Sequence, residues 1–127
     1  MYELKVVTRF AAAHQLKMVT EKCENLHGHN WRIEVFVSGA ELDHSGVLID
    51  FGEIKKYLAG IIDSLDHKFL NELEFFKSAN PSSENIARFI AFELQASLND
   101  HPLVNVSRIS VWESDDACAT FYMPKAD

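Results

Sequence analysis

Histidine and cysteine side chains gather in one short stretch, CENLHGHNW, at residues 23–31. His27 and His29 are two residues apart, and Cys23 stands four residues before His27. In extended backbone, residues two apart project from the same face, with Cα atoms about 6.5–7 Å apart. Two imidazole nitrogens at that separation can meet on one metal ion. The spacing indicates a metal site with a thiol beside it, although H-x-H alone is equally compatible with a histidine-containing turn.

His14 is the candidate for a third ligand. It ends a segment of alternating apolar and polar residues, and it lies on the even-numbered face of that segment. His27 and His29 begin the next alternating segment, on its odd-numbered apolar face. An antiparallel hairpin would bring the end of the first segment to the start of the second. Three neutral imidazoles with an open fourth position form the arrangement of catalytic zinc sites, so the sequence predicts bound Zn²⁺.

Cys23 has three interpretations. As a fourth ligand it would close a tetrahedral site and make the zinc structural. As a thiol beside a metal-bound substrate, it could lose its proton and act as a base. As a small buried residue it would only fill the core, but its polar neighbours, Glu21-Lys22 before it and Glu24-Asn25 after it, disfavour this interpretation.

Two further groups could carry chemistry. In Asp66-His67 a carboxylate precedes an imidazole, which it could orient and polarise; the same dipeptide is also common at helix ends. Glu113 continues the apolar face of a strand pattern after Ile109 and Val111. A carboxylate there either faces solvent or holds a ligand with adjacent N–H donors, because burying it without partners is costly.

Hydrophobic alternation predicts four strands that would position these residues. Residues 2–10 and 31–37 alternate with a period of two, as half-buried strands do. Residues 104–113 and 117–123 form two more strand patterns near the end of the chain.

Two amphipathic helices are expected between the strand pairs. Apolar residues recur every three or four positions over residues 54–65, in a helix that starts near Phe51. The second helix follows Pro81, with Ser82 or Ser83 as N-cap, and His101-Pro102 ends it, because the residue before proline disfavours the helical region.

The predicted order is therefore ββααββ. It indicates an α+β fold, in which a four-stranded antiparallel sheet carries two helices on one face. At 127 residues the whole chain, residues 1–127, is expected to form a single domain. Four strands leave two open edges, which a homo-oligomer would pair.

Composition excludes several classes of partner. Twelve basic residues against nineteen acidic ones give a net charge of −7, with no basic stripe for nucleic acid. No apolar span is long enough to cross a membrane, and the N-terminal residues are charged, so a cytoplasmic location is expected.

Several segments together resemble one family, the 6-pyruvoyltetrahydropterin synthase and 6-carboxytetrahydropterin synthase family. The resemblance spans residues 10–122, and the combination of its segments is specific. These segments are FAAAHQL, CENLHGHNW, VLIDFGEIK, LDHKFLN, NPSSENIA and WES.

The resemblance implies a role for each candidate residue. It assigns the zinc to His14, His27 and His29, proton acceptance to Cys23, a catalytic pair to Asp66 and His67, and a catalytic, pterin-anchoring carboxylate to Glu113. It also implies the tunnelling fold, in which three subunits close a barrel and two trimers stack, so that a trimer or a dimer of trimers is expected. Candidates for contacting the triphosphate, by proximity in sequence alone, are Lys17, Lys22 and Lys68.

The spacing of Cys23 from His27 resembles the bacterial carboxy-forming branch that feeds queuosine and other 7-deazapurines. The expected activity is a zinc-dependent carbon–carbon lyase that converts 7,8-dihydroneopterin triphosphate to 6-carboxy-5,6,7,8-tetrahydropterin, with release of triphosphate and acetaldehyde. The alternatives are a pyruvoyl-forming synthase, a non-catalytic zinc protein closed by Cys23, and another three-histidine metalloenzyme such as an iron oxygenase.

Overall fold

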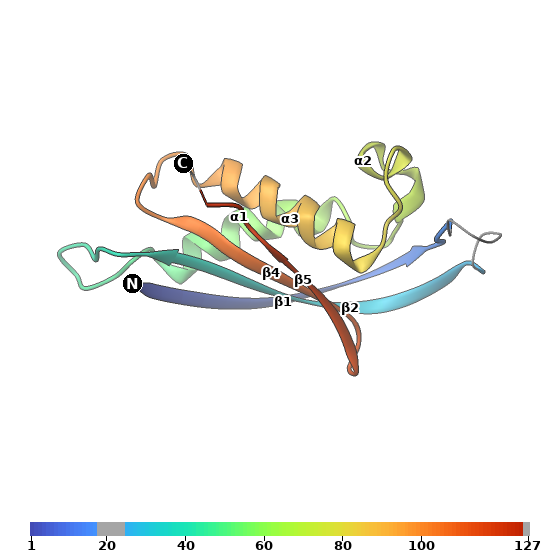
Figure 1. Ribbon diagram of the computed structural model, residues 1–127, viewed down its shortest axis with the longest axis horizontal. Coiled ribbons are helices and arrows are strands. Elements are labelled where there is room, and N and C mark those ends of the chain that lie inside the picture. The colour runs from blue at the N-terminus through green and yellow to red at the C-terminus, as the bar shows by residue number, and fades with distance from the viewer. Residues whose placement is uncertain (18–24, 126–127) are drawn as a thin grey trace.

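The computed structural model describes residues 1–17 and 25–125, and it has the predicted α+β architecture. Two long strands come first, then the helical region, then a C-terminal hairpin (Figure 1). The elements are β1 (Tyr2–His14), β2 (His27–Gly39), α1 (Phe51–Asp63), β3 (Lys68–Phe69), a 3₁₀ turn η1 (Leu70–Glu72), α2 (Glu74–Lys77), α3 (Ser83–Ser97), β4 (Asn105–Ser114) and β5 (Ala117–Tyr122).

The sheet has five strands, in the order β3-β1-β2-β4-β5. The prediction of four strands was wrong, because β3 adds a two-residue parallel partner at the end of β1, where Ala12 and Ala13 pair with Lys68 and Phe69. The four-residue helix α2 was also not predicted. Elements this short leave no periodic pattern in a sequence, so hydrophobic alternation cannot detect them. All other neighbouring strands are antiparallel.

Side-chain caps determine where the two long helices begin. Asp50 is the N-cap of α1, and its side chain accepts a hydrogen bond from the Gly52 N–H at 2.6 Å. The helix itself begins at Phe51, as predicted. Of the two candidate serines, Ser82 is the N-cap of α3, and its Oγ accepts from the Asn85 N–H at 3.1 Å. The helix α3 ends at Ser97, earlier than the predicted stop before Pro102. In the described residues, no helix has the length and hydrophobicity needed to span a membrane.

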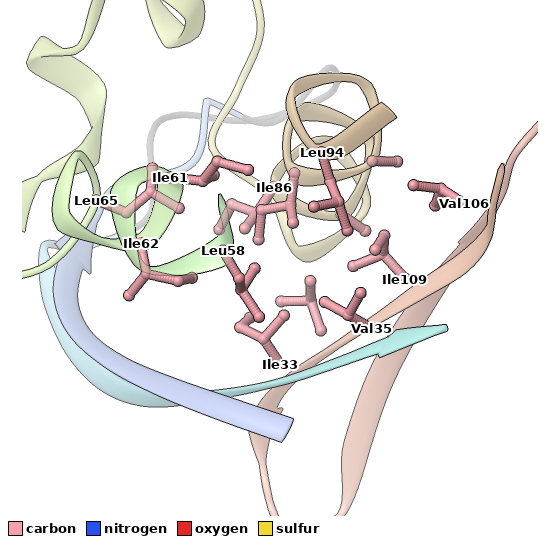
Figure 2. Close-up of a cluster of buried hydrophobic side chains, with 14 of the residues drawn as sticks. Ile33, Val35, Leu58, Ile61, Ile62, Leu65, Ile86, Leu94, Val106 and Ile109 are labelled. Carbon is pink, nitrogen blue, oxygen red and sulfur yellow. The ribbon is translucent and has the colours of Figure 1, made fainter. Parts of the chain in front are cut away.

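The core lies between one face of the sheet and the helices α1 and α3 (Figure 1). Apolar side chains from both layers point into this shared space, as Figure 2 shows for Ile33 and Ile109 from the sheet and Leu58 and Leu94 from the helices. All four are at most 2% exposed. Burial of these side chains fixes which face of each strand points inward, and therefore which residues share a face at the strand ends.

The opposite face of the sheet holds a network of charged residues around Glu34, which is only 8% exposed. The carboxylate of Glu34 lies 2.9 Å from Lys5 Nζ and 3.1 Å from an Arg32 guanidinium nitrogen, and it accepts a hydrogen bond from the Trp112 indole N–H at 2.6 Å. The hydrogen bond with Lys5 contributes most to lowering the pKa of Glu34 below its ordinary value, against the opposing effect of burial. Glu34 is therefore ionised at neutral pH and links three strands of the sheet.

We expect Glu34→Gln to lower the free energy of unfolding at pH 7 by about 1–3 kcal/mol, because the neutral amide weakens charge-assisted hydrogen bonds. Since the pKa of Glu34 is lower in the folded state, its stabilisation is complete above about pH 4.5 and disappears as the pH falls through the folded-state pKa. Urea unfolding at pH 7, 5 and 3.5, at one protein concentration, should show the two proteins converging at low pH. The exposed Glu41 provides the control Glu41→Gln. A stability difference that stays constant with pH would contradict the prediction.

Candidate metal centre

The pairing of β1 with β2 brings three imidazoles together. His14 and His27 form the last residue pair of the antiparallel ladder, and His29 pairs with Ala12. The three rings have centroids 4.6–5.1 Å apart and stand nearly perpendicular to one another. The predicted convergence of His14 with the H-x-H pair is therefore present within one chain.

Backbone carbonyl groups fix the orientation of two of the rings. Nδ1 of His14 lies 2.8 Å from the Pro81 carbonyl oxygen, and Nδ1 of His27 lies 2.7 Å from the Asn25 carbonyl oxygen. Because a carbonyl oxygen only accepts, each Nδ1 carries the hydrogen, and each Nε2 presents its lone pair. This is the arrangement in which histidine binds a metal ion, with the second ring nitrogen held by an outer hydrogen bond.

Trp31 forms the apolar floor of the cluster. Its ring packs edge-on against His14 and His29, at centroid distances of 5.0 and 5.1 Å, and it is fully buried. The indole N–H donates to the Ala12 carbonyl at 3.2 Å, so the tryptophan leaves no polar group without a partner. The cluster is therefore attached directly to the hydrophobic core, and His14 itself is 0% exposed.

Glu113 reaches the imidazoles from β4. Its Oε1 lies 2.8 Å from Nε2 of His29, 3.7 Å from Nε2 of His14 and 3.8 Å from Nε2 of His27. A register shift between β4 and β5 at this point gives β4 one extra residue between Trp112 and Ser114, and that residue is Glu113. The sequence left open whether Glu113 faces solvent or has partners. In the described residues, its carboxylate contacts the imidazoles.

The donor set fits a divalent metal ion. One ligand atom from each of His14, His27, His29 and Glu113 can be chosen so that all four lie within 4.8 Å of one another. Three imidazole nitrogens and a carboxylate oxygen belong to the ligand types that Zn²⁺ accepts. Within residues 1–17 and 25–125, this is the one group of histidine, cysteine and acidic side chains with that geometry. The cluster can therefore hold a metal ion.

Asp66 and His67 lie on the other side of β1, at the edge that faces away from β2. Asp66 Oδ1 accepts from the Ala11 N–H at 2.9 Å, and the His67 N–H donates to the Ala11 carbonyl. The carboxylate also contacts His67 Nδ1 at 3.0 Å. The hydrogen bond from Ala11 is the main reason that the pKa of Asp66 is lowered, and the contact with His67 adds to it. His67 has a left-handed backbone with φ of 57°, and its side chain is 81% exposed.

Comparison with models of protein families shows to which family this chain belongs. The family model described as 6-pyruvoyl tetrahydropterin synthase matches residues 3–124. The chain belongs to this pterin synthase family. The resemblance seen in the sequence segments is therefore confirmed, and it extends over nearly the whole chain.

Relatives within the pterin synthase family carry different activity names. The dihydroneopterin monophosphate aldolase of Pyrococcus furiosus is 37% identical over 107 residues, which cover 84% of this chain and 85% of the relative. The 6-carboxy-5,6,7,8-tetrahydropterin synthase of Synechocystis is 32% identical over 121 residues, covering 91% and 89%. The structure of the Caenorhabditis elegans 6-pyruvoyl tetrahydropterin synthase matches with a TM-score of 0.85 over 97% of this chain and 96% of that one, at 24% identity, which supports the shared fold.

The structure describes some of the candidate site residues and leaves others outside the described ranges. Cys23 and Lys22 lie outside the described residues, so the role of the thiol stays a prediction. Pro81 holds His14 through its backbone carbonyl, a contact that the sequence did not predict. No residue-type pattern could have revealed it, because every residue carries a carbonyl group.

We expect His27→Ala and His29→Ala to lose the stoichiometric binding of a divalent metal ion, because each removes a ligand nitrogen. Metal content per chain after dialysis, and the affinity for added Zn²⁺, would measure this. His44→Ala, at an exposed turn, is the control. Parent-like affinity in both ligand variants would exclude this metal centre.

Proposed function

We propose that this protein is a zinc-dependent lyase that converts 7,8-dihydroneopterin triphosphate and water to 6-carboxy-5,6,7,8-tetrahydropterin, triphosphate and acetaldehyde. The observation that carries the proposal is the convergence of His14, His27 and His29, with Nδ1 of two rings committed to carbonyl groups, in a chain of the pterin synthase family. The four-residue spacing from Cys23 to His27 and a relative named as a 6-carboxy synthase favour this product. A place in queuosine biosynthesis and a cytoplasmic location belong to the same proposal.

The three histidines would hold the zinc, and Glu113 would bind the pterin. Zinc bound there supplies a Lewis acid, which makes the hydroxyl groups and adjacent C–H bonds of the substrate side chain more acidic. The Glu113 carboxylate has two oxygens that can accept from adjacent N–H and amino groups of the pterin ring. Its side chain is 36% exposed, so a ligand can reach it.

Proton transfer is assigned to Cys23 and His67. As a thiolate, Cys23 would accept a proton from carbon. Asp66 stays ionised at neutral pH because its pKa is lowered, and its contact with Nδ1 orients the His67 ring for proton exchange with the substrate. Elimination of triphosphate followed by retro-aldol cleavage leaves the first side-chain carbon on the pterin and releases the other two as acetaldehyde. The pterin ring and its side chain exchange oxidation levels, so no external reductant is needed.

The exposed position of Asp66 and His67 supports a site that is shared between subunits. The pair lies on the outer edge of β1, whereas the imidazoles lie toward β2. Strand β3 covers only Ala12 and Ala13 of that edge, and β5 ends the sheet on the other side. A second copy that pairs with these edges would bring its own residues beside Asp66 and His67. We therefore propose a homo-oligomer, a trimer or a dimer of trimers, as the active form.

Two related activities compete with this assignment. The pyruvoyl-forming synthase keeps all three side-chain carbons and is favoured by the name of the family model. An aldolase would cleave the same carbon–carbon bond without expelling phosphate, and the name of the P. furiosus relative favours it. The sequence also offers a second proton acceptor for such a reaction, because Glu24 follows Cys23 directly.

Incubation of the zinc-loaded protein with 7,8-dihydroneopterin triphosphate, followed by mass analysis of all products, tests the assignment. We expect 6-carboxytetrahydropterin, with equal amounts of acetaldehyde and free triphosphate. Free triphosphate without acetaldehyde would identify the pyruvoyl-forming reaction. A hydroxymethyl pterin with phosphorylated glycolaldehyde, and no free triphosphate, would identify the aldolase. His29→Ala is the control for turnover that depends on the metal centre.

Cys23→Ala distinguishes an enzyme from a structural zinc protein. We expect the variant to keep its zinc and its fold and to lose turnover about 100-fold or more, as removal of a general base does. Zinc content, circular dichroism and product formation should be measured on the same sample. Cys118→Ala, which removes the exposed thiol of β5, is the matched control. Loss of zinc together with unfolding in Cys23→Ala would instead support a closed structural site.

A further inference from the structure

Residues 71–82, which we call the support segment, supply the outer contact of the metal ligand His14. This segment leads from η1 through α2 to the N-cap of α3. The Pro81 carbonyl oxygen accepts from His14 Nδ1 at 2.8 Å, and both residues are buried, so the hydrogen bond is shielded from water. With Nδ1 committed to the carbonyl group, Nε2 is the nitrogen that faces the metal cluster. The position of the Pro81 carbonyl therefore fixes the direction in which His14 presents its ligand atom.

Asn85 holds the support segment on both sides of Pro81. From the first turn of α3, its side-chain amide donates to the Asn80 carbonyl at 2.8 Å. Its backbone N–H donates to Oγ of Ser82, the N-cap, at 3.1 Å. The residues before and after Pro81 are thus bound to one residue of a helix, and buried residues such as Ile86 fix that helix in the core.

The support segment also holds the residues that follow His14. The β1–β2 ladder ends at His14, and beyond it two asparagine side chains bind the backbone. Asn71 accepts from the Gln15 N–H at 2.9 Å and donates to the Gln15 carbonyl at 2.7 Å. Asn80 binds the same two backbone groups of Lys17, at 3.1 and 2.6 Å. The end of β1, with its metal ligand, therefore rests on the support segment.

We infer that metal binding at the three-histidine cluster is coupled to the packing of the support segment, with Asn85 as a positioning residue. A metal ion on Nε2 of His14 requires the tautomer with hydrogen on Nδ1, and the Pro81 carbonyl stabilises the same tautomer. An ion therefore binds more tightly when the support segment is in place. By thermodynamic reciprocity, the bound ion stabilises the packed segment by the same factor. Asn85 and Pro81 are not among the four residues of the cluster. The inference rests on the metal centre of the proposed function, and not on the pterin reaction.

Hydrogen exchange of the whole protein, with bound zinc and with zinc removed by a chelator, tests the coupling without turnover. We expect zinc to slow amide exchange in the support segment by about 10-fold more than in α1, a usual size for coupling between two sites. Helix α1 is the internal control, because it supplies none of the contacts described above. Exchange that slows by the same factor in both would reflect global stabilisation alone and would overturn the inference.

Asn85→Asp and Asn85→Ala test the positioning role. Each removes the donor to the Asn80 carbonyl and keeps the backbone N–H that binds Ser82. We expect the affinity for Zn²⁺ to fall about 10-fold, as changes in the outer contacts of metal ligands do. Exchange in the support segment of the zinc-loaded variants should be faster than in the parent. Asn99→Asp and Asn99→Ala make the same changes at an exposed turn and should keep the parental affinity.

Urea unfolding in the presence of a chelator separates positioning from stability. We expect Asn85→Asp to keep the parental midpoint without zinc, because a carboxylate in the first turn of α3 interacts favourably with the helix dipole. A lower zinc affinity then reflects the position of His14 and not the stability of the fold. Parental affinity in both Asn85 variants, or an affinity loss matched by an equal loss of stability without zinc, would overturn the inference. A zinc-loaded parent that shows the coupling but does not turn over the pterin would refute the proposed function and still support the coupling.

Discussion

The register of β1 against β2 is the constraint on which the rest of the structure depends. The ladder runs without a shift from the pair of Tyr2 with Gly39 to the pair of His14 with His27. Because side chains alternate between faces, a slip by one residue would turn every inward side chain outward, including the ligands. Burial of Val6, Phe10 and Ile33 against the helices excludes that slip. The hydrophobic core thus selects which side chains meet at the far end of the ladder.

The metal centre and the core form one continuous structure through Trp31. Its ring separates the imidazoles from the apolar interior, and it stacks at 6.0 Å against Phe10, which is itself a core residue. The His14 side chain, which is 0% exposed, is confined by this packing. The geometry required for metal binding is therefore maintained by apolar packing together with the outer hydrogen bonds, which orient the rings of His14 and His27 and select their tautomers.

Sequence patterns predicted the long strands and the three-histidine cluster because both depend on the alternation of side chains along a strand. The alternation of residues 2–10 and 31–37 was sufficient to place His14 on the same face as His27 and His29. The patterns missed features that do not depend on periodicity. Strand β3 has two residues, and the hydrogen bonds from Asn71 and Asn80 join residues more than fifty positions apart in the chain. Glu113 was placed on the correct face, but its contact with the imidazoles depends on an extra residue in β4, which no alternation pattern reveals.

The four residues Ala11–His14 of β1 connect the Asp66–His67 pair with the imidazole cluster. Ala11 holds Asp66 and His67 through its backbone, and three residues later His14 contributes a ring to the metal cluster. The spacing between these two attachment points is thus the rise of a strand, about 10 Å for three residues. Strands stretch and shorten very little, so loop motion does not change the distance between these two attachment points on β1.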